Sequence, residues 1–88
     1  MSGAGWQVYM LRCGDGSLYT GITTDIGRRL ARHRAGRGAR CLRGRLPLEL
    51  VYLESGHDRG SASRREAAIK RLSRKEKWRL VASADGRV

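Results

Sequence analysis

Two segments with the composition of strands, separated by a turn sequence, predict a β-hairpin near the start of the chain. Residues 6–12 (Trp-Gln-Val-Tyr-Met-Leu-Arg) and 18–23 (Leu-Tyr-Thr-Gly-Ile-Thr) are rich in aromatic and branched side chains, which favour strands. The segment between them contains Gly-Asp-Gly, a sequence typical of a tight turn. We therefore expect two antiparallel strands joined by this turn.

The length of this turn decides on which face each side chain lies. A two-residue Asp-Gly turn would place Tyr9 and Tyr19 on opposite faces, because successive side chains of a strand alternate. A three-residue loop with Gly16 at positive φ instead pairs Cys13 with Ser17 and brings both tyrosines to one face. We expect the three-residue loop.

A helical pattern follows the hairpin. From Ile26 onward, apolar side chains and then His33 fall at positions i, i+4 and i+7, the spacing of one helix face. Thr24 or Asp25 can cap the N-terminus of this helix. Gly36 is expected to end it, and part of the Gly-Arg segment that follows is expected to form a short helix.

The second half of the chain predicts one more strand and a broken helical region. Residues 48–54 are mostly apolar and have strand propensity, and residues 56–60 are expected to form a loop. Ser61 or Ser63 begins the last helical region. Ser73 is expected to break or kink it, which leaves a short final helix.

This order of elements predicts an α+β fold, with a small three-stranded, mainly antiparallel sheet flanked by helices. The chain of 88 residues fits one domain, residues 1–88, with a core of about residues 6–81 and flexible ends. Trp6, Tyr52 and Trp78 are expected to belong to that core.

The charge of the chain indicates a polyanionic partner. Nineteen Lys and Arg stand against eight Asp and Glu, which gives a formal net charge of +11. Eight arginines, here called the basic belt, lie in a segment without one acidic residue: Arg28, Arg29, Arg32, Arg34, Arg37, Arg40, Arg43 and Arg45. A solvated surface normally mixes both signs, and the planar guanidinium suits phosphate oxygens. We expect nucleic acid to contact six of these, Arg28, Arg32, Arg37, Arg40, Arg43 and Arg45, together with Lys70.

Several other classes of protein are disfavoured. Cys13 and Cys41 have no Cys-x-x-Cys spacing, so we expect two reduced thiols and neither a zinc site nor a disulfide framework. The longest apolar run has four residues, which predicts no membrane span and favours a cytoplasmic location. No Walker motif and no carboxylate cluster for a two-metal site is present. A monomer is expected, and a protein partner stays open.

Five residues form a second pattern in the sequence, and one of them, the arginine, also belongs to the basic belt: Tyr9, Tyr19, Arg29, His33 and Glu66. The tyrosines end Gln-Val-Tyr and begin Tyr-Thr-Gly, and the arginine and histidine stand in Arg-Leu-x-x-His. The glutamate begins Glu-x-x-Ile-Lys-x-Leu-Ser-Arg-Lys. Over roughly residues 6–80 this pattern resembles the GIY-YIG nuclease family, in particular its small stand-alone bacterial, UPF0213-like members.

The resemblance implies a metal-dependent endonuclease that hydrolyses phosphodiester bonds in DNA, selects its substrate by structure and acts in DNA repair or recombination. DNA is expected rather than RNA. Glu66 would hold one Mg²⁺ or Mn²⁺ ion, and Arg29 would hold the scissile phosphate. Tyr9 or Tyr19 would position a water molecule and accept its proton, and His33 would supply a catalytic hydrogen bond.

Four of these five residues also have a purely structural interpretation. Ser63-Arg-Arg-Glu66 matches a helix capping box, and Lys70 stands at the i+4 position for an ion pair with Glu66. His33 could be a buried core histidine, and both tyrosines could simply pack in a half-buried strand. A nucleic-acid-binding module with the same fold and little or no catalysis is therefore the main alternative. An RNA-binding, ribosome-associated protein is a third.

Overall fold

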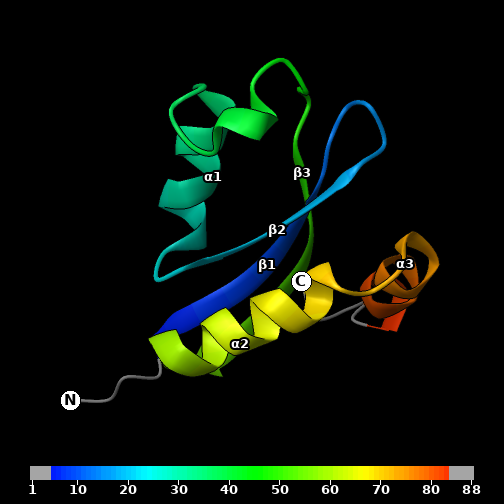
Figure 1. The fold of residues 1–88 in the computed structure, drawn as a ribbon. Coiled ribbons are helices and arrows are strands. Elements are labelled where there is room, and N and C mark those ends of the chain that lie inside the picture. Colours follow the sequence, from blue (N-terminus) through cyan, green and yellow to red (C-terminus); the bar gives the residue numbers. More distant parts are fainter. Residues whose placement is uncertain (1–4, 84–88) are drawn as a thin grey trace.

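The computed structural model describes residues 5–83, and every side chain among them except that of residue 41. Three strands, β1 (Trp6–Arg12), β2 (Leu18–Thr23) and β3 (Glu49–His57), form one antiparallel sheet in the order β2-β1-β3. The helices are α1 (Ile26–Arg34), the 3₁₀ helix η1 (Arg40–Leu42), α2 (Arg59–Lys70) and α3 (Arg74–Ser83) (Figure 1). The predicted α+β class and element order are confirmed, whereas the expectation of flexible ends concerns residues outside the described range.

A three-residue loop closes the hairpin, as expected. The backbone N–H of Cys13 donates to the Ser17 carbonyl at 2.9 Å, and Gly16 has a φ of 85°. Only glycine adopts such a conformation without steric cost. The resulting register brings Tyr9 and Tyr19 to the same face, with ring centroids 6.2 Å apart.

Strand β3 is longer than predicted, and its bounds correct the expected range of 48–54. It continues through Gly56, which has a φ of 83°, to His57. The ladder persists because Trp6, at the start of β1, pairs with His57 across an irregularity in the register. The expected loop of residues 56–60 is therefore shorter, because its first residues belong to β3 and its last residues to the next helix.

Helix α2 also begins earlier than predicted. Its N-cap is Asp58, whose carboxylate accepts the Ser61 N–H at 2.8 Å, while the Ser61 hydroxyl accepts the Asp58 N–H at 3.2 Å. Ser61 thus completes a capping box instead of preceding the helix, and Ser63 lies inside it. The expected break at Ser73 is confirmed, because this residue separates α2 from α3.

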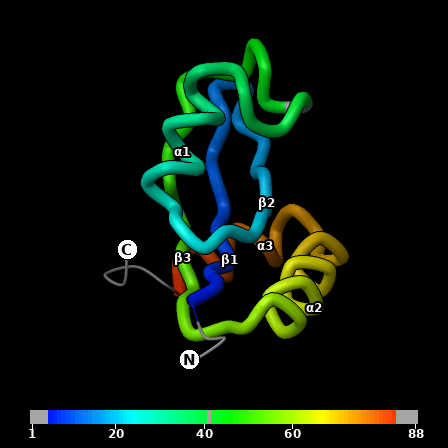
Figure 2. Tube along the Cα trace, turned by 90° about the vertical axis from the view of Figure 1, so that its left-hand side faces the viewer, coloured from blue at the N-terminus to red at the C-terminus, as the bar shows by residue number. Residues whose placement is uncertain are grey.

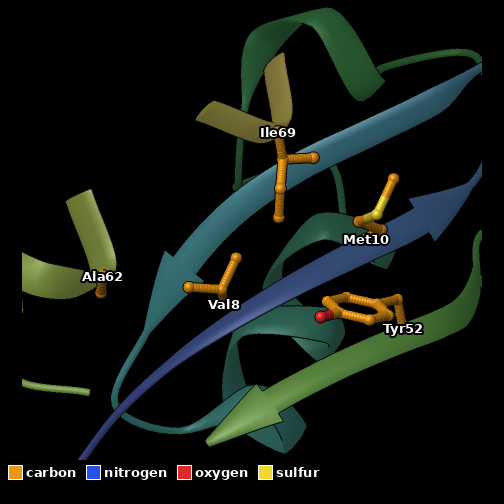
Figure 3. Packing of buried hydrophobic residues seen from close by; sticks show 5 residues of the cluster. All are labelled: Val8, Met10, Tyr52, Ala62 and Ile69. Atoms are coloured by element: carbon orange, nitrogen blue, oxygen red, sulfur yellow. The ribbon is translucent and has the colours of Figure 1, made fainter. Parts of the chain in front are cut away.

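Helices cover the sheet on both faces (Figure 2). Val8 and Met10 of β1 point toward α2, where they form a core with Tyr52, Ala62 and Ile69 (Figure 3). The alternate residues Tyr9 and Leu11 form a second core with Cys13, Leu42 and Leu48, against which Ile26 and Leu30 of α1 pack. The alternation of β1 thus separates an α2 side from an α1 side.

Two of the three aromatic residues expected in the core are found there. Tyr52 is 4% exposed, and Trp6 packs against the same cluster from its edge. Trp78 is a correction, because α3 contributes Leu80 and Val81 to the core while Trp78 is absent from the described side chains packed against either cluster. No helix in the described range has the length and apolar character to cross a membrane.

Candidate active site

Tyr9 lies at the centre of the candidate site. Its side chain is 1% exposed, and its hydroxyl is 2.8 Å from His33 Nε2 on α1. Gly21 faces it across the ladder, and a Cβ atom there would stand 2.6 Å from Tyr9 Oη. The glycine of the Tyr-Thr-Gly motif therefore leaves room for the Tyr9 ring to cross β2 toward α1.

The surroundings of His33 determine which of its nitrogens carries the proton. The Ala39 N–H donates to His33 Nδ1 at 3.1 Å, so Nδ1 is an acceptor. In a neutral imidazole the proton then resides on Nε2, which donates to the Tyr9 oxygen. Burial lowers the pKa of His33, and the charges of Arg29 and Arg32 lower it further. His33 is therefore a neutral hydrogen-bond donor to Tyr9.

The Tyr9 hydroxyl keeps its proton. Burial raises the pKa of Tyr9 most strongly, the neighbouring Tyr19 raises it further, and the positive charge of Arg29 only partly opposes this. A hydrogen bond with the Tyr19 side chain also raises the pKa of Tyr9. A series of contacts thus runs from Ala39 through His33 and Tyr9 to Tyr19, whose half-buried ring meets the imidazole edge to face at 5.5 Å.

A polar hollow of about 290 Å³ opens beside this network at the N-terminus of α1. We call it the arginine hollow, and its lining residues are Thr23, Thr24, Asp25, Arg28, Arg29 and Arg32. Asp25 is the N-cap, since its carboxylate accepts the Arg28 N–H at 3.1 Å. Three guanidinium groups and two hydroxyls in one hollow can hold a phosphate.

The threonines of the arginine hollow were missed by sequence reasoning. Thr23 and Thr24 precede α1 as Thr-Thr-Asp, which was interpreted only as a capping signal. That signal fixes where the helix begins, and Arg28 and Arg29 then fall in its first turn, next to the end of β2. The sequence Thr-Thr-Asp could thus have indicated an anion site as well as the start of a helix.

Glu66 lies on α2, with a side chain that is 24% exposed. Its capping interpretation is excluded, because Ser63 is inside the helix and Asp58 is the cap. The ion pair with Lys70 is present, at 3.2 Å between Lys70 Nζ and Glu66 Oε2. The Glu66 charge also raises the pKa of Tyr9, although it is the smallest of the named causes.

Glu66 offers a hard cation one carboxylate ligand. Within residues 5–83, Cys41 excepted, no group of three or more His, Cys, Asp or Glu side chains could hold a metal ion. Mg²⁺ is commonly bound through one or two carboxylates, with water and substrate phosphates completing its shell. The partly exposed Glu66 can supply one such carboxylate, and a cation bound there would displace the Lys70 ammonium from it.

The other residues of the basic belt lie in or next to the loop between α1 and β3, and several of them make contacts that stabilise it. The guanidinium groups of Arg34 and Arg43 donate to backbone carbonyls at 2.9 and 3.1 Å, and Arg45 lies 3.6 Å from the Asp15 carboxylate. Arg37 and Arg40 are exposed on the same segment. The belt thus shapes its own loop and leaves a cationic surface on it.

The structure brings three of the five predicted site residues into contact with one another, and the charges of the other two influence the pKa of Tyr9. Tyr9, Tyr19 and His33 are in ring contact, and Arg29 and Glu66 act on the Tyr9 hydroxyl through their charges. These residues come from four different elements, β1, β2, α1 and α2.

A family model described as the GIY-YIG catalytic domain matches residues 5–79. The chain belongs to the GIY-YIG family. This family consists of nucleases that act on nucleic acid, so the domain indicates a nuclease-type function. Its two tyrosine motifs are Gln-Val-Tyr of β1 and Tyr-Thr-Gly of β2 in this member.

Relatives of this GIY-YIG chain carry the name UPF0213 protein. Those of Yersinia pestis (strain Pestoides F) and Yersinia pseudotuberculosis (serotype O:1b) are each 49% identical over 81 residues, covering 92% of this chain and 85% of the relative. The solution NMR structure of a Bacillus halodurans UPF0213 protein has 44% identity and a TM-score of 0.61, covering 92% and 86% of the two chains. A second NMR structure, of an E. faecalis protein, has 38% identity and a TM-score of 0.58, covering 84% and 80%.

Proposed function

We propose that this protein is a metal-dependent endonuclease that hydrolyses phosphodiester bonds in DNA. The observation that carries the proposal is the hydrogen bond from the neutral His33 to the buried Tyr9, with Tyr19 in ring contact, beside the arginine hollow and within electrostatic reach of Glu66. Tyr9 and His33 also pack in the core on the α1 side of the sheet, so cleavage rather than binding distinguishes this function from that of a module that only binds phosphates.

Tyr19 is the phenol that accepts the proton of the attacking water, and Tyr9 positions it. Tyr9 is buried and its pKa is raised, so it neither meets water nor ionises readily. Tyr19 is half-buried and forms a hydrogen bond with the Tyr9 side chain. With Tyr9 as its donor, such a bond stabilises negative charge on the Tyr19 oxygen, which a phenol needs because its ordinary pKa is about 10.

The arginine hollow holds the nucleic-acid backbone. Arg29 is half-buried between the hollow and Tyr9, so its guanidinium can stabilise the negative charge that grows on the scissile phosphate. Arg28 and Arg32 are exposed at the rim and bind the adjacent phosphate. Hydrolysis adds the water oxygen to phosphorus and breaks the bond to the leaving sugar oxygen.

Glu66 holds one Mg²⁺ or Mn²⁺ ion, which when bound withdraws negative charge from the phosphate oxygens as a Lewis acid. Lys70 balances the Glu66 carboxylate in the free protein and can contact a phosphate once released from it. Phosphate contacts position a protein without reading bases. We therefore propose selection by DNA shape, at branched or partly single-stranded sites such as those of repair and recombination.

The test measures nicking of branched, single-stranded and duplex DNA, and of matching RNAs, with Mg²⁺, Mn²⁺ or EDTA. Glu66→Gln should reduce cleavage to background, and Tyr19→Phe should reduce its rate by about 10²- to 10⁴-fold, the contribution of a general base. Glu49→Gln is the matched control and should leave the rate unchanged, because Glu49 is an exposed acid of β3 whose partner is Arg12. Cleavage that persists in Glu66→Gln or in EDTA would refute the assigned metal site. Tight binding without any cleavage would instead establish the binding module.

A further inference from the structure

The outer face of α3 has a composition unlike that of the other helices. A shallow hollow of about 630 Å³ lies on it, lined by Arg74, Lys75, Trp78, Arg79 and Ala82, which we call the α3 face. Leu80 and Val81 of the same helix pack against the core. Trp78 therefore presents its half-buried ring to this hollow instead of to the interior.

The α3 face is cationic. Arg74, Lys75 and Arg79 are exposed around Trp78. Glu76 is the one acidic residue of α3, and it is engaged at the helix start, where its carboxylate accepts the Ser73 N–H at 2.9 Å. An aromatic ring flanked by three cations is the combination with which proteins bind the bases and the phosphates of a single strand together.

Helix α3 is fixed next to the strand that carries Tyr19. The Arg74 guanidinium donates to the Gly16 carbonyl at 3.0 Å, which attaches α3 to the hairpin turn. Lys77 lines a smaller hollow with Ser17 and Leu18, where the edge strand β2 begins. A strand that passes along β2 can therefore reach the α3 face without crossing the sheet.

We propose that the α3 face binds an unpaired nucleotide of a single-stranded nucleic acid, with the base stacked on Trp78 and the neighbouring phosphates on Lys75 and Arg79. The proposal rests on the proposed nuclease function and assigns to it a second contact for an unpaired strand. A second copy of this chain is a poorer occupant, because each copy carries a formal net charge of +11. A polyanion is attracted by the same charge.

Intrinsic fluorescence can observe this contact directly. The chain has two tryptophans, so Trp6→Phe leaves Trp78 as the single reporter. The titrant is an octamer of thymidine in EDTA, compared with an abasic octamer that has the same phosphates and no bases. We expect the thymidine octamer to quench Trp78 and the abasic octamer to bind more weakly without quenching. The proposal would be refuted if neither octamer quenched the Trp78 emission, or if both quenched it equally. It would also be refuted if the emission changed with protein concentration alone, because that change indicates self-association.

Affinity gives a second measurement in the chain with both tryptophans. Stacking contributes about 1–3 kcal/mol per base, so Trp78→Ala should weaken binding of the thymidine octamer by about 5- to 150-fold. Trp78→Phe should retain most of the affinity, and Leu46→Ala, which removes an exposed apolar side chain elsewhere, should retain all of it. Circular dichroism checks that each variant is folded. Unchanged octamer affinity in Trp78→Ala would refute the stacking contact.

The two proposals fail in different ways. The Trp78→Ala variant should keep the wild-type affinity for blunt duplex DNA, because the arginine hollow and Glu66 lie outside the α3 face. An equal loss for duplex and octamer would refute base stacking. Base-dependent quenching in a protein that cleaves no substrate would refute the nuclease function alone, whereas cleavage without quenching would refute the α3 contact alone.

Discussion

Replacing Gly21 with alanine tests the packing that places the two tyrosines. The added Cβ would lie 2.6 Å from Tyr9 Oη, 2.7 Å from Tyr9 Cζ and 3.1 Å from Tyr19 Cε2. Optimal separations between carbon atoms are about 3.5–4.0 Å, so the Tyr9 ring must move by about 1 Å. That ring is 1% exposed and hydrogen-bonded to His33, so the movement either strains the core or breaks the bond.

The expected cost follows from these two effects. Overpacking a core costs about 1–3 kcal/mol, and a buried donor left without its acceptor costs about another 1–3 kcal/mol. Gly21→Ala should therefore lower the free energy of unfolding by about 2–6 kcal/mol. For a small domain, whose total stability is about 5–15 kcal/mol, this is a large fraction.

Gly27→Ala makes the same chemical change where the structure has room. Gly27 lies exposed in the first turn of α1, and the nearest heavy atom to an added Cβ is Asp25 Oδ1 at 3.7 Å, an ordinary contact distance. Glycine is less favourable than alanine in a helix by up to about 1 kcal/mol. Gly27→Ala should thus be neutral or stabilising, opposite in sign to Gly21→Ala.

Urea unfolding followed by circular dichroism measures both variants. An unchanged slope with urea concentration shows that the same surface is exposed on unfolding, so that the midpoints can be compared. A Gly21→Ala midpoint equal to or above that of the wild type would refute the close packing of the Tyr9 ring on β2. A parallel loss in both glycine variants would instead indicate a general intolerance of alanine.

Three further predictions use the same unfolding assay. Tyr9→Phe should cost about 1–3 kcal/mol, because His33 Nε2–H loses its buried acceptor; no loss would contradict the assigned bond. Since folding lowers the pKa of His33 below its unfolded value of about 6.5, the unfolded chain binds more protons as the pH falls below that value. Stability should therefore decrease from about pH 6.5 downward, and a dependence equally steep in His33→Gln would exclude His33 as its source. Asp25→Ala should cost about 1 kcal/mol through loss of the α1 cap, whereas Asp25→Asn keeps a capping oxygen and should lose only a few tenths; equal losses would show that charge rather than capping matters.

Local rules predicted the hairpin but left two turn lengths open, and the three-residue loop was expected because it brings the two tyrosines to one face. The three-residue loop with Gly16 at positive φ fixes which residues face each other, and the strand alternation then places Tyr9 and Tyr19 together. The start of α2 was mistaken because two local signals compete there. Asp58-x-x-Ser and Ser63-x-x-Glu both resemble caps, and the choice depends on how far β3 extends. That length is set by a distant residue, since Trp6 pairs with His57 and leaves Asp58 at the junction.

The choice between the two tyrosines was open in the sequence for a similar reason. The resemblance to the GIY-YIG family implies that Tyr9, Tyr19 and His33 belong to one site, but not the direction of the hydrogen bond between Tyr9 and His33. That direction depends on the backbone N–H of Ala39, in a Gly-Arg segment whose path no side-chain pattern predicts. Gly38 allows this approach, since a Cβ there would overlap the His33 imidazole. A backbone donor on Nδ1 thus commits the Nε2 proton to Tyr9, and the burial of Tyr9 supports the half-buried Tyr19 as the proposed proton acceptor.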